Sequence, residues 1–282
     1  MSERRSAVGA LLAKQRPLIM GILNVTPDSF SDGGKNIGVH TAVAAALSMV
    51  EAGADIIDIG GESTRPGASD VATEEELERT IPVIEALSSA SPVVMSIDSS
   101  KPEVMSAAVR AGATLINDVR ALQAPGALQA ASEAGVHVCL MHMQGAPRTM
   151  QENPSYTDVV VEVGEFLQQR IDACVDAGID RSRILLDPGF GFGKHLEDNL
   201  ALVRGLSSLS GMGYPVLAGL SRKSMIGAIT GRSVEHRLVG SVILAAACVE
   251  RGAKIVRVHD VGETLDGLKA LGAIHGEAWW EQ

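Results

Sequence analysis

The stretch Val93-Val-Met-Ser-Ile-Asp98 is a short apolar run that ends in a carboxylate, and runs of this form decide the fold class. A strand that is buried on both faces is continuously apolar, as in a parallel sheet covered by helices. Seven more such runs alternate with helix-like stretches: Ile19–Val25, Asp55–Gly61, Leu115–Val119, Val136–His142, Ile184–Pro188, Pro215–Ser221 and Ile255–Asp260. Eight strand-helix units predict an α/β fold, a (β/α)8 TIM barrel in a single domain.

Glycines before five of the runs support one repeating domain. Each stands in a short string such as Glu51-Ala-Gly-Ala54, and glycine is favoured in the left-handed conformation just after a helix. The next strand then begins within a few residues, as short connections require. Helices are expected over Thr157–Ala177 and Ser233–Arg251. A third begins at Thr73, whose side chain is predicted to form a capping box with Glu76.

The composition narrows the classes of function. The chain has 282 residues, of which 46% are hydrophobic and only 3% aromatic, so a large core must be aliphatic. The net charge of -10 argues against nucleic-acid and membrane-surface partners. The first 16 residues hold no sustained apolar stretch, and no window approaches the ~20 apolar residues of a membrane span. We therefore expect a cytoplasmic protein.

The three cysteines point to neither a disulfide framework nor a metal site. Cys139, Cys174 and Cys248 are odd in number and far apart in the sequence. Cysteine is among the residues most often buried, so we expect three reduced, buried thiols.

The eight runs end in polar residues, and in a (β/α)8 barrel the carboxyl ends of the strands surround the mouth that carries the chemistry. Two polar segments, Thr26–His40 and Glu62–Val71, follow the first two runs and rise from the same mouth. Loops of that length are often functional, so we interpret them as lids, with a surface insertion as the alternative. The run ends are Asn24, Asp58, Asp98, Asn117, His142, Asp187, Ser221 and Arg257–Asp260.

Three of these ends, Asp98, Asn117 and Asp187, are predicted to converge across the barrel. Buried carboxylates are costly unless they are paired or hydrogen-bonded. Two carboxylates and an amide suit a flat heterocycle that presents N–H donors and a carbonyl, such as a 2-amino-4-oxo-pyrimidine ring. A carboxylate can bind the N–C–N edge of such a ring with both oxygens, as it binds guanidinium. Asp118 is interpreted instead as a structural residue that bonds a neighbouring loop.

Cationic residues follow the last two runs. Ser221-Arg222-Lys223 comes after the seventh, while Arg257 and His259 alternate along the eighth and therefore face one side. Barrels often bind phosphate near the loops after these two strands. A Schiff-base role for Lys223 keeps a lyase open as an alternative.

A glycine-rich stretch, Asp187-Pro-Gly-Phe-Gly-Phe-Gly-Lys194, follows the sixth run. It lacks the spacing of a nucleotide-binding P-loop. We interpret it as a tight loop in which Phe190 or Phe192 is exposed over the mouth, with packing as the alternative.

Taken together, these strings resemble the dihydropteroate synthase family of pterin-binding enzymes. The resemblance runs from about Pro17 to about Leu271. It implies the condensation of 6-hydroxymethyl-7,8-dihydropterin diphosphate with 4-aminobenzoate to 7,8-dihydropteroate and diphosphate, with Mg²⁺, in folate synthesis. It also implies competition between sulfonamides and 4-aminobenzoate. The matching segments are residues 20–34, 58–67, 96–102, 116–118, 140–145, 187–194, 221–227 and 257–260.

Carried over residue by residue, the resemblance implies the following roles. The pterin pocket comprises Asp98, Asn117, Met141, Asp187, Lys223 and Arg257, of which Asp98, Asp187, Lys223 and Arg257 are the catalytic set. The diphosphate site comprises Asn24, Arg257 and His259, with Asn24 also at the metal. The 4-aminobenzoate site comprises Thr64, Arg65, Pro66, Phe192, Ser221 and Lys223.

The alternative within related barrels is a pterin-binding methyltransferase that acts with a corrinoid partner. Such an enzyme needs neither the two Gly/Pro loops nor the Ser-Arg-Lys string. We expect residues 1–16 to be an N-terminal extension, 17–275 the barrel and 276–282 a tail. The expected partners are the small-molecule substrates and a second copy in a homodimer, without nucleic acid or membrane.

Overall fold

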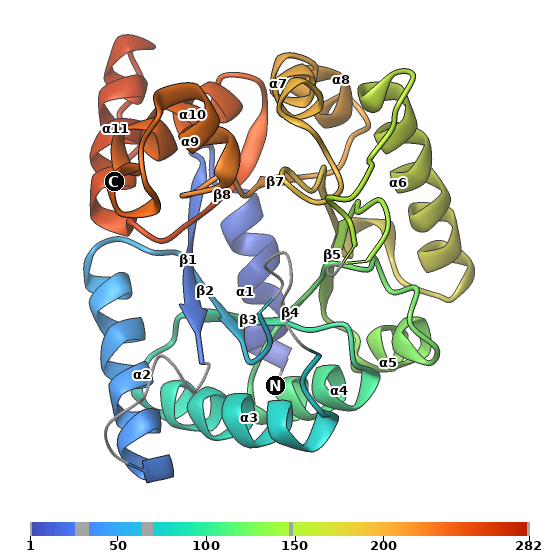
Figure 1. The fold of residues 1–282 in the computed structure, drawn as a ribbon. Helices are drawn as coiled ribbons and strands as arrows, with labels where there is room; N and C mark the ends of the chain where they lie inside the picture. The colour runs from blue at the N-terminus through green and yellow to red at the C-terminus, as the bar shows by residue number, and fades with distance from the viewer. Residues whose placement is uncertain (1, 26–33, 64–69, 147–148, 281–282) are drawn as a thin grey trace.

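The computed structural model is a closed barrel of eight parallel strands surrounded by helices (Figure 1), as predicted. It describes residues 2–25, 34–63, 70–146 and 149–280. The strands follow one another around the barrel in chain order, and the last pairs with the first. They are β1 (Leu18–Asn24), β2 (Ile56–Gly60), β3 (Val94–Asp98), β4 (Leu115–Asp118), β5 (His137–Met141), β6 (Ile184–Asp187), β7 (Val216–Ala218) and β8 (Ala253–Val258).

Apart from the first and the last, the helices connect successive strands along the outside of the barrel. The helix predicted over residues 233–251 is shorter than expected, because a 3₁₀ turn at Val234–His236 precedes it. A second 3₁₀ turn, Arg181–Arg183, leads into β6. The α-helices are α1 (Ser2–Leu12), α2 (Gly34–Glu51), α3 (Thr73–Ala90), α4 (Pro102–Ala111), α5 (Ala127–Ala134), α6 (Val159–Asp176), α7 (Leu196–Arg204), α8 (Leu206–Ser210), α9 (Ser224–Thr230), α10 (Leu238–Val249) and α11 (Val261–Ile274).

The glycines that end the helices have the predicted left-handed backbone. Gly53, Gly112, Gly135, Gly178 and Gly252 have φ angles of 106°, 133°, 63°, 86° and 95°. A side chain is strained at such angles. Each glycine therefore lets the chain leave a helix and enter the next strand within a few residues.

The predicted capping box at the start of α3 is wrong. The helix begins at Thr73, but its N-cap is Ala72 and no side chain caps it. The Glu76 carboxylate instead lies fully buried and accepts from the Lys101 ammonium. A charge-assisted bond of this kind is stronger than a neutral cap, so the tertiary partner prevails over the local pattern.

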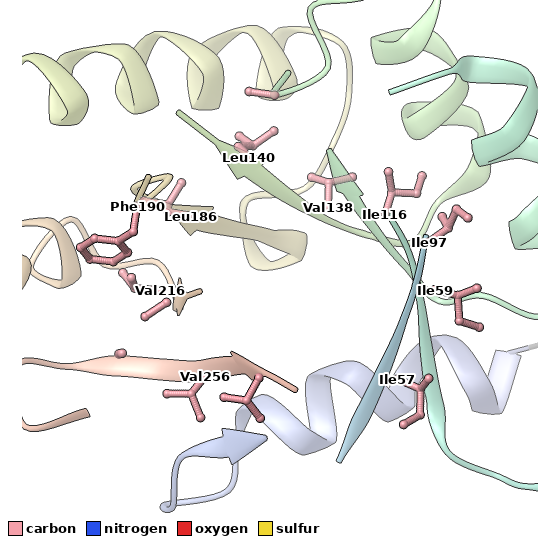
Figure 2. Packing of buried hydrophobic residues seen from close by; sticks show 14 of the residues in the cluster. Ile57, Ile59, Ile97, Ile116, Val138, Leu140, Leu186, Phe190, Val216 and Val256 are labelled. Carbon is pink, nitrogen blue, oxygen red and sulfur yellow. The ribbon is translucent and has the colours of Figure 1, made fainter. Parts of the chain in front are cut away.

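Alternate residues of the strands build two cores. Outward residues pack between the barrel and the helices, as Figure 2 shows for Ile57, Ile97, Val138 and Leu186. The inward residues near the strand starts form an apolar floor, and Val8 of α1 is fully buried against it. The floor residues are Leu18, Met20, Ile56, Val94, Leu115, Cys139, Leu185, Leu217 and Ile255.

The ends of the chain pack against the body of the molecule. The ring of Trp280 lies 4.9 Å from the guanidinium carbon of Arg16, just before β1. Trp279 packs against the outer core. Among the residues the structure describes, no helix is long and apolar enough to cross a membrane.

Candidate functional site

Above the apolar floor, the inward positions of the strands become polar. Asp98 on β3 lies opposite Asn117 on β4 in the strand register. Asp187 on β6 likewise lies opposite Met141 on β5. All four side chains are buried. The structure thus brings the predicted acceptors together at the carboxyl end of the barrel, as parallel strands require.

Arg257 on β8 is the centre of this polar layer. Its Nε donates to Oδ2 of Asp58 at 2.6 Å, and one terminal nitrogen donates to Oδ2 of Asp98 at 2.7 Å. Asn117 donates its amide to the same oxygen of Asp58 at 3.0 Å. The guanidinium therefore joins β2, β3 and β8 across the barrel.

Asp58 was predicted to lie at the mouth, but the sequence reasoning gave it no role in the site. It is fully buried, and one of its oxygens holds both Arg257 and Asn117. The signal was present, because Asp58 alternates with the inward residues Ile56 and Gly60. Its role is to orient Arg257 and Asn117, which depends on contacts between distant strands and not on a local pattern.

The two predicted acids are held in different ways. Burial raises the pKa of Asp98 to about 7, although the Arg257 guanidinium acts in the opposite direction. Burial also raises the pKa of Asp187, and the nearby Lys223 ammonium opposes it. One oxygen of Asp187 accepts the backbone N–H of Gly189 at 2.7 Å. Asp98 is thus close to the boundary between its neutral and ionised forms near neutral pH.

Lys223 faces the glycine-rich loop at the start of α9. Its ammonium donates to the carbonyl of Phe190 and lies 4.6 Å from the centre of the Phe192 ring. Burial lowers the pKa of Lys223 to about 8, while the Asp187 carboxylate raises it. Phe190 is fully buried in the core and Phe192 is half-buried. Of the two phenylalanines, only Phe192 therefore has surface left for a ligand.

The other predicted residues after β7 and β8 also meet. Ser221 Oγ lies 3.0 Å from Nδ1 of His259 and accepts the His259 backbone N–H at 3.2 Å. Arg222 has a left-handed backbone, with φ of 58°, and its guanidinium pairs with Asp260. Arg222 is therefore already committed to a protein partner, whereas Ser221 and His259 lie at the mouth.

Asn24 ends β1 with an exposed side chain. In the strand register it lies opposite Gly60, which in turn lies opposite Asp98. Asn24 thus belongs to the same rim of the barrel as the acids.

His142 does not belong to the ring of mouth residues, and this prediction is wrong. On β5 the inward residues are Cys139 and Met141, so the next residue faces outward. The His142 ring packs edge-on against Phe166 of α6, with 4.9 Å between ring centres. Its Nδ1 lies 2.9 Å from the buried ammonium of Lys194.

The two predicted lids are described only in part. Residues 26–33 and 64–69 lie outside the described residues, and with them the predicted Thr64, Arg65 and Pro66. Residues 34–40 belong to α2, so the first segment is shorter than the predicted 26–40.

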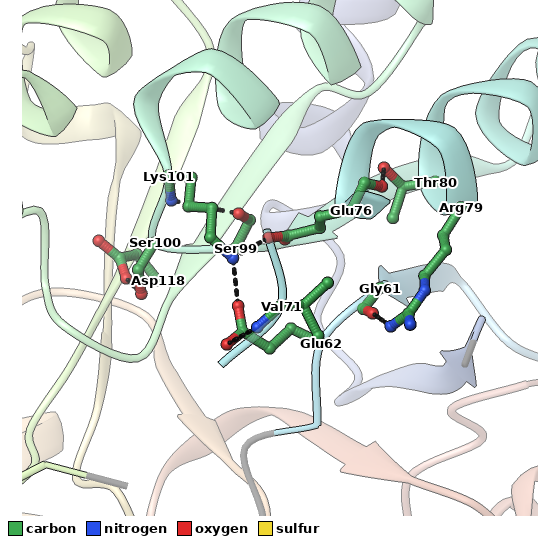
Figure 3. Close-up of polar contacts among 10 residues, drawn as sticks. All are labelled: Gly61, Glu62, Val71, Glu76, Arg79, Thr80, Ser99, Ser100, Lys101 and Asp118. Atoms are coloured by element: carbon green, nitrogen blue, oxygen red, sulfur yellow. Dashed lines mark hydrogen bonds and ion pairs between the residues drawn. The ribbon is translucent and has the colours of Figure 1, made fainter. Parts of the chain in front are cut away.

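The ends of the second segment are held by an ion cluster (Figure 3). The Glu62 carboxylate accepts the backbone N–H of Val71 at 3.2 Å and also binds the Lys101 ammonium. Lys101 in turn binds the buried Glu76, and Arg79 donates to the carbonyl of Gly61 at 2.6 Å. Burial opposes the charge on Lys101, but its bonds to the two glutamates raise its pKa above the ordinary value.

Asp118 is structural, as interpreted. Its two oxygens accept the backbone N–H groups of Arg120 at 2.8 Å and Leu122 at 2.7 Å. The Ser100 hydroxyl, which Figure 3 shows beside Asp118, also donates to it. The side chain thus fixes the turn that follows β4.

The three cysteines are free and buried, as expected. Within the described part of the chain, no three His, Cys, Asp or Glu side chains are placed to hold a metal ion. Beside Met141 lies a cavity of about 270 Å³, which Val119 and Phe166 also line.

Known proteins agree with this arrangement. The sequence signature described as "Pterin binding enzyme" matches residues 20–259. Dihydropteroate synthase of Escherichia coli K12 is 51% identical over 267 residues, covering 95% of each chain. The structure of Yersinia pestis dihydropteroate synthase with a sulfonamide drug is 50% identical, with a TM-score of 0.88, over 93% of this chain and 95% of that one.

A further solved structure of a relative holds 7,8-dihydropteroate. Xanthomonas albilineans dihydropteroate synthase in complex with 7,8-dihydropteroate is 51% identical, with a TM-score of 0.84, over 93% of this chain and 94% of that chain. Such identity over almost the whole length shows common descent as well as a common fold. The chain belongs to the dihydropteroate synthase family of pterin-binding enzymes.

Proposed function

We propose that this protein condenses 6-hydroxymethyl-7,8-dihydropterin diphosphate with 4-aminobenzoate, giving 7,8-dihydropteroate and diphosphate. The observation that carries the proposal is the buried network in which Arg257 joins Asp58 and Asp98 beside Asn117. Relatives with half of their residues identical are dihydropteroate synthases, and one of them was solved with 7,8-dihydropteroate. Three cysteines without disulfides suit the reducing cytoplasm.

The pterin ring would lie against the acids of the polar layer. Asp187 and Asn117 offer acceptors and donors to the edge of the heterocycle, and the buried setting strengthens each bond. The free oxygen of Asp98 remains for a ring N–H while its other oxygen holds Arg257. Met141 would cover one side of the ring from β5.

Bond breaking would be largely dissociative. The diphosphate leaves first, and positive charge develops on the pterin at its exocyclic methylene. Ionised carboxylates fixed beside the ring stabilise such charge without reorganising, which is the role we assign to Asp98 and Asp187. Arg257 and His259 would bind the departing diphosphate on the cationic side of the mouth.

The residues of the mouth fit a magnesium ion that arrives with the diphosphate. Mg²⁺ keeps several waters and is usually bound by few protein groups together with substrate phosphates. Asn24 offers a hard oxygen ligand from an exposed position on the rim, and we propose that it contacts the ion. When bound, Mg²⁺ would offset the negative charge that develops on the leaving group.

The amine of 4-aminobenzoate would attack the cationic methylene from the side of the glycine-rich loop, and the nitrogen of the new C–N bond would then lose one proton to solvent. Phe192 and Lys223 face each other there, and Ser221 lies close to His259. We assign the substrate ring to Phe192 and its carboxylate to the hydroxyl and the cation. Thr64, Arg65 and Pro66 are proposed to complete this site, so binding of 4-aminobenzoate should follow binding of the pterin diphosphate.

A homodimer is proposed from the outer face of the last helices. Val239 and Ile243 lie one turn apart on α10 and are 69% and 61% exposed. The helix α11 lies beside α10 (Figure 1), and Ile274 at the C-terminal end of α11 is also exposed. Exposed apolar residues that cluster often mark an interface, and a two-fold dimer is the commonest assembly. Sedimentation of the wild type and of Ile243→Asp should give a dimer and a monomer.

The decisive experiment measures diphosphate release. Purified protein with the pterin diphosphate should release diphosphate only when 4-aminobenzoate and Mg²⁺ are both present. Release without 4-aminobenzoate would contradict the condensation. Methyl transfer to a corrinoid, with no diphosphate formed, would instead support the methyltransferase alternative.

A further inference from the structure

Lys194 is a buried cation to which the proposed reaction gives no role. Its side chain is only 3% exposed, at the end of the glycine-rich loop. Its ammonium donates to the carbonyls of Gly189 at 2.9 Å and Phe192 at 3.0 Å, and it lies 2.9 Å from Nδ1 of His142. The His142 carbonyl lies 3.5 Å away as a fourth, weaker acceptor, so these partners can use all three protons of an ammonium.

The partner His142 suits this arrangement chemically. Burial, together with the nearby Lys194 charge, lowers the pKa of His142 to about 3. The ring is therefore neutral, and a neutral ring can accept a hydrogen bond at Nδ1. The partners of Lys194 are thus hydrogen-bond acceptors from the glycine-rich loop and from His142.

The loop Gly189–Gly193, whose carbonyls Lys194 binds, packs closely against the segment that follows β5. Gly189 and Gly193 have φ angles of 69° and 62°. A Cβ at these two positions would lie 1.8 Å from the carbonyl oxygen of His142 and 2.3 Å from that of Gln144. The loop therefore depends on glycine geometry and on donors that neutralise its inward carbonyls.

The same loop controls the surroundings of Lys223. The carbonyl of Phe190 accepts from the Lys223 ammonium, and the Phe192 ring lies 4.6 Å from it. Lys194 bonds directly to the carbonyl of Phe192. A change at Lys194 would thus move the aromatic ring and the cation that we assign to 4-aminobenzoate.

We propose that Lys194 is a positioning residue for the 4-aminobenzoate side of the site, which acts by holding the loop Gly189–Gly193 so that Phe192 and Lys223 face each other. This inference rests on the proposed condensation. The pterin side should be less affected, because Asn117, Asp58 and Arg257 bond to one another, although Asp187 accepts the backbone N–H of Gly189 in the loop and Lys223 donates to Phe190.

The test compares two lysines of similar chemistry at opposite ends of the barrel. Lys194→Met keeps the length of the side chain and removes its three donors. Lys254→Met is the matched control, since the Lys254 ammonium also binds backbone carbonyls, those of Lys14 and Arg16, below the apolar floor. Steady-state kinetics and thermal unfolding are measured for both variants and the wild type.

For Lys194→Met we expect the KM for 4-aminobenzoate to rise at least about tenfold, because two buried carbonyls lose their donor and the loop shifts. The KM for the pterin diphosphate should change less than about threefold. The control should change neither KM by more than about twofold, since surface and distant sites act independently. Equal increases in both KM values for Lys194→Met would overturn the inference and leave a purely structural role.

A double-mutant cycle with Phe192→Ala tests whether Lys194 acts through the ring. If it does, Lys194→Met should have little further effect on the KM for 4-aminobenzoate once Phe192 is truncated. Fully additive effects would contradict the mechanism. Should Lys194→Met fail to fold, Lys194→Gln retains two donors and should give an intermediate KM, and an unchanged KM there would count against the proposal. A wild type that forms no dihydropteroate would refute the proposed function itself.

Discussion

The stability of the Asp98→Asn variant should increase relative to that of the wild type as the pH rises. The pKa of Asp98 is about 7 in the folded protein, raised mainly by burial, against 3.8 in the unfolded chain. Between these values the folded state holds a proton that the unfolded state has released. Stability is therefore lost as the pH rises through this window, and the loss is complete above about pH 7.

The magnitude follows from the difference between the two pKa values. Each pH unit within the window lowers the free energy of unfolding by about 1.4 kcal/mol. From pH 5 to pH 8 the wild type should lose about 3 kcal/mol relative to Asp98→Asn, since only the part below about pH 7 contributes. The asparagine keeps the shape and can still accept from Arg257 through its amide oxygen. Differences in packing between the two proteins should therefore contribute little to the pH dependence of their difference in unfolding free energy.

The assay is urea denaturation of both proteins at four pH values across this range. Lys194 and Lys223 also titrate near neutral pH, with pKa values of about 7 and about 8. Lys194 is unchanged in both proteins and cancels in the difference, whereas the pKa of Lys223 is raised in part by the Asp98 carboxylate and should be lower in Asp98→Asn. Asp172→Asn, which changes an exposed carboxylate on α6, should stay within about 0.5 kcal/mol of the wild type. A difference between wild type and Asp98→Asn that is the same at all pH values would refute the reasoning.

Three further changes test other contacts. Asp187→Asn should cost at least ~2 kcal/mol of pterin affinity in calorimetry, because a donor replaces an acceptor in a buried site, and unchanged affinity would remove the residue from the pocket. Lys101→Met should lower the free energy of unfolding by at least ~2 kcal/mol, since it leaves the buried Glu76 carboxylate unpaired, whereas Glu75→Gln on the exposed side of α3 should cost under ~0.5 kcal/mol. Arg257→Lys should lower kcat/KM at least tenfold, as a point charge cannot reproduce a fork that joins two carboxylates, and near-normal kcat/KM would contradict that role.

The fold could be predicted because its signals are repeated and local. Burial on both faces makes each strand an apolar run, and a glycine with positive φ marks the end of five helices. The acids and the amide of the site were found for the same reason. Each of the three ends a buried run, where a polar or charged side chain is costly unless it has a bonding partner: Asp98, Asn117 and Asp187.

The predictions that were wrong concern side chains whose position depends on the exact strand register or on a partner far away in the sequence. His142 ends its run, but a step of one residue along a strand changes the face, and the ring lies outside the barrel against Phe166. Glu76 matched a local capping pattern, yet Lys101 binds it from 25 residues away in the sequence. Lys194 was interpreted only as the end of a glycine-rich loop, because no local pattern indicates that its ammonium binds acceptors both in that loop and at His142, 52 residues away.

The helix α1 beneath the barrel limits how substrates and products can reach and leave the site. Val8 is buried against the inward residues at the start of the strands, and Leu11 and Leu12 pack beside it. The apolar floor and α1 thus close the end of the barrel where the strands begin, and the site is reached from the opposite end. Both substrates must therefore enter, and diphosphate and product must leave, through the same mouth. Product release has to precede the next round of substrate binding.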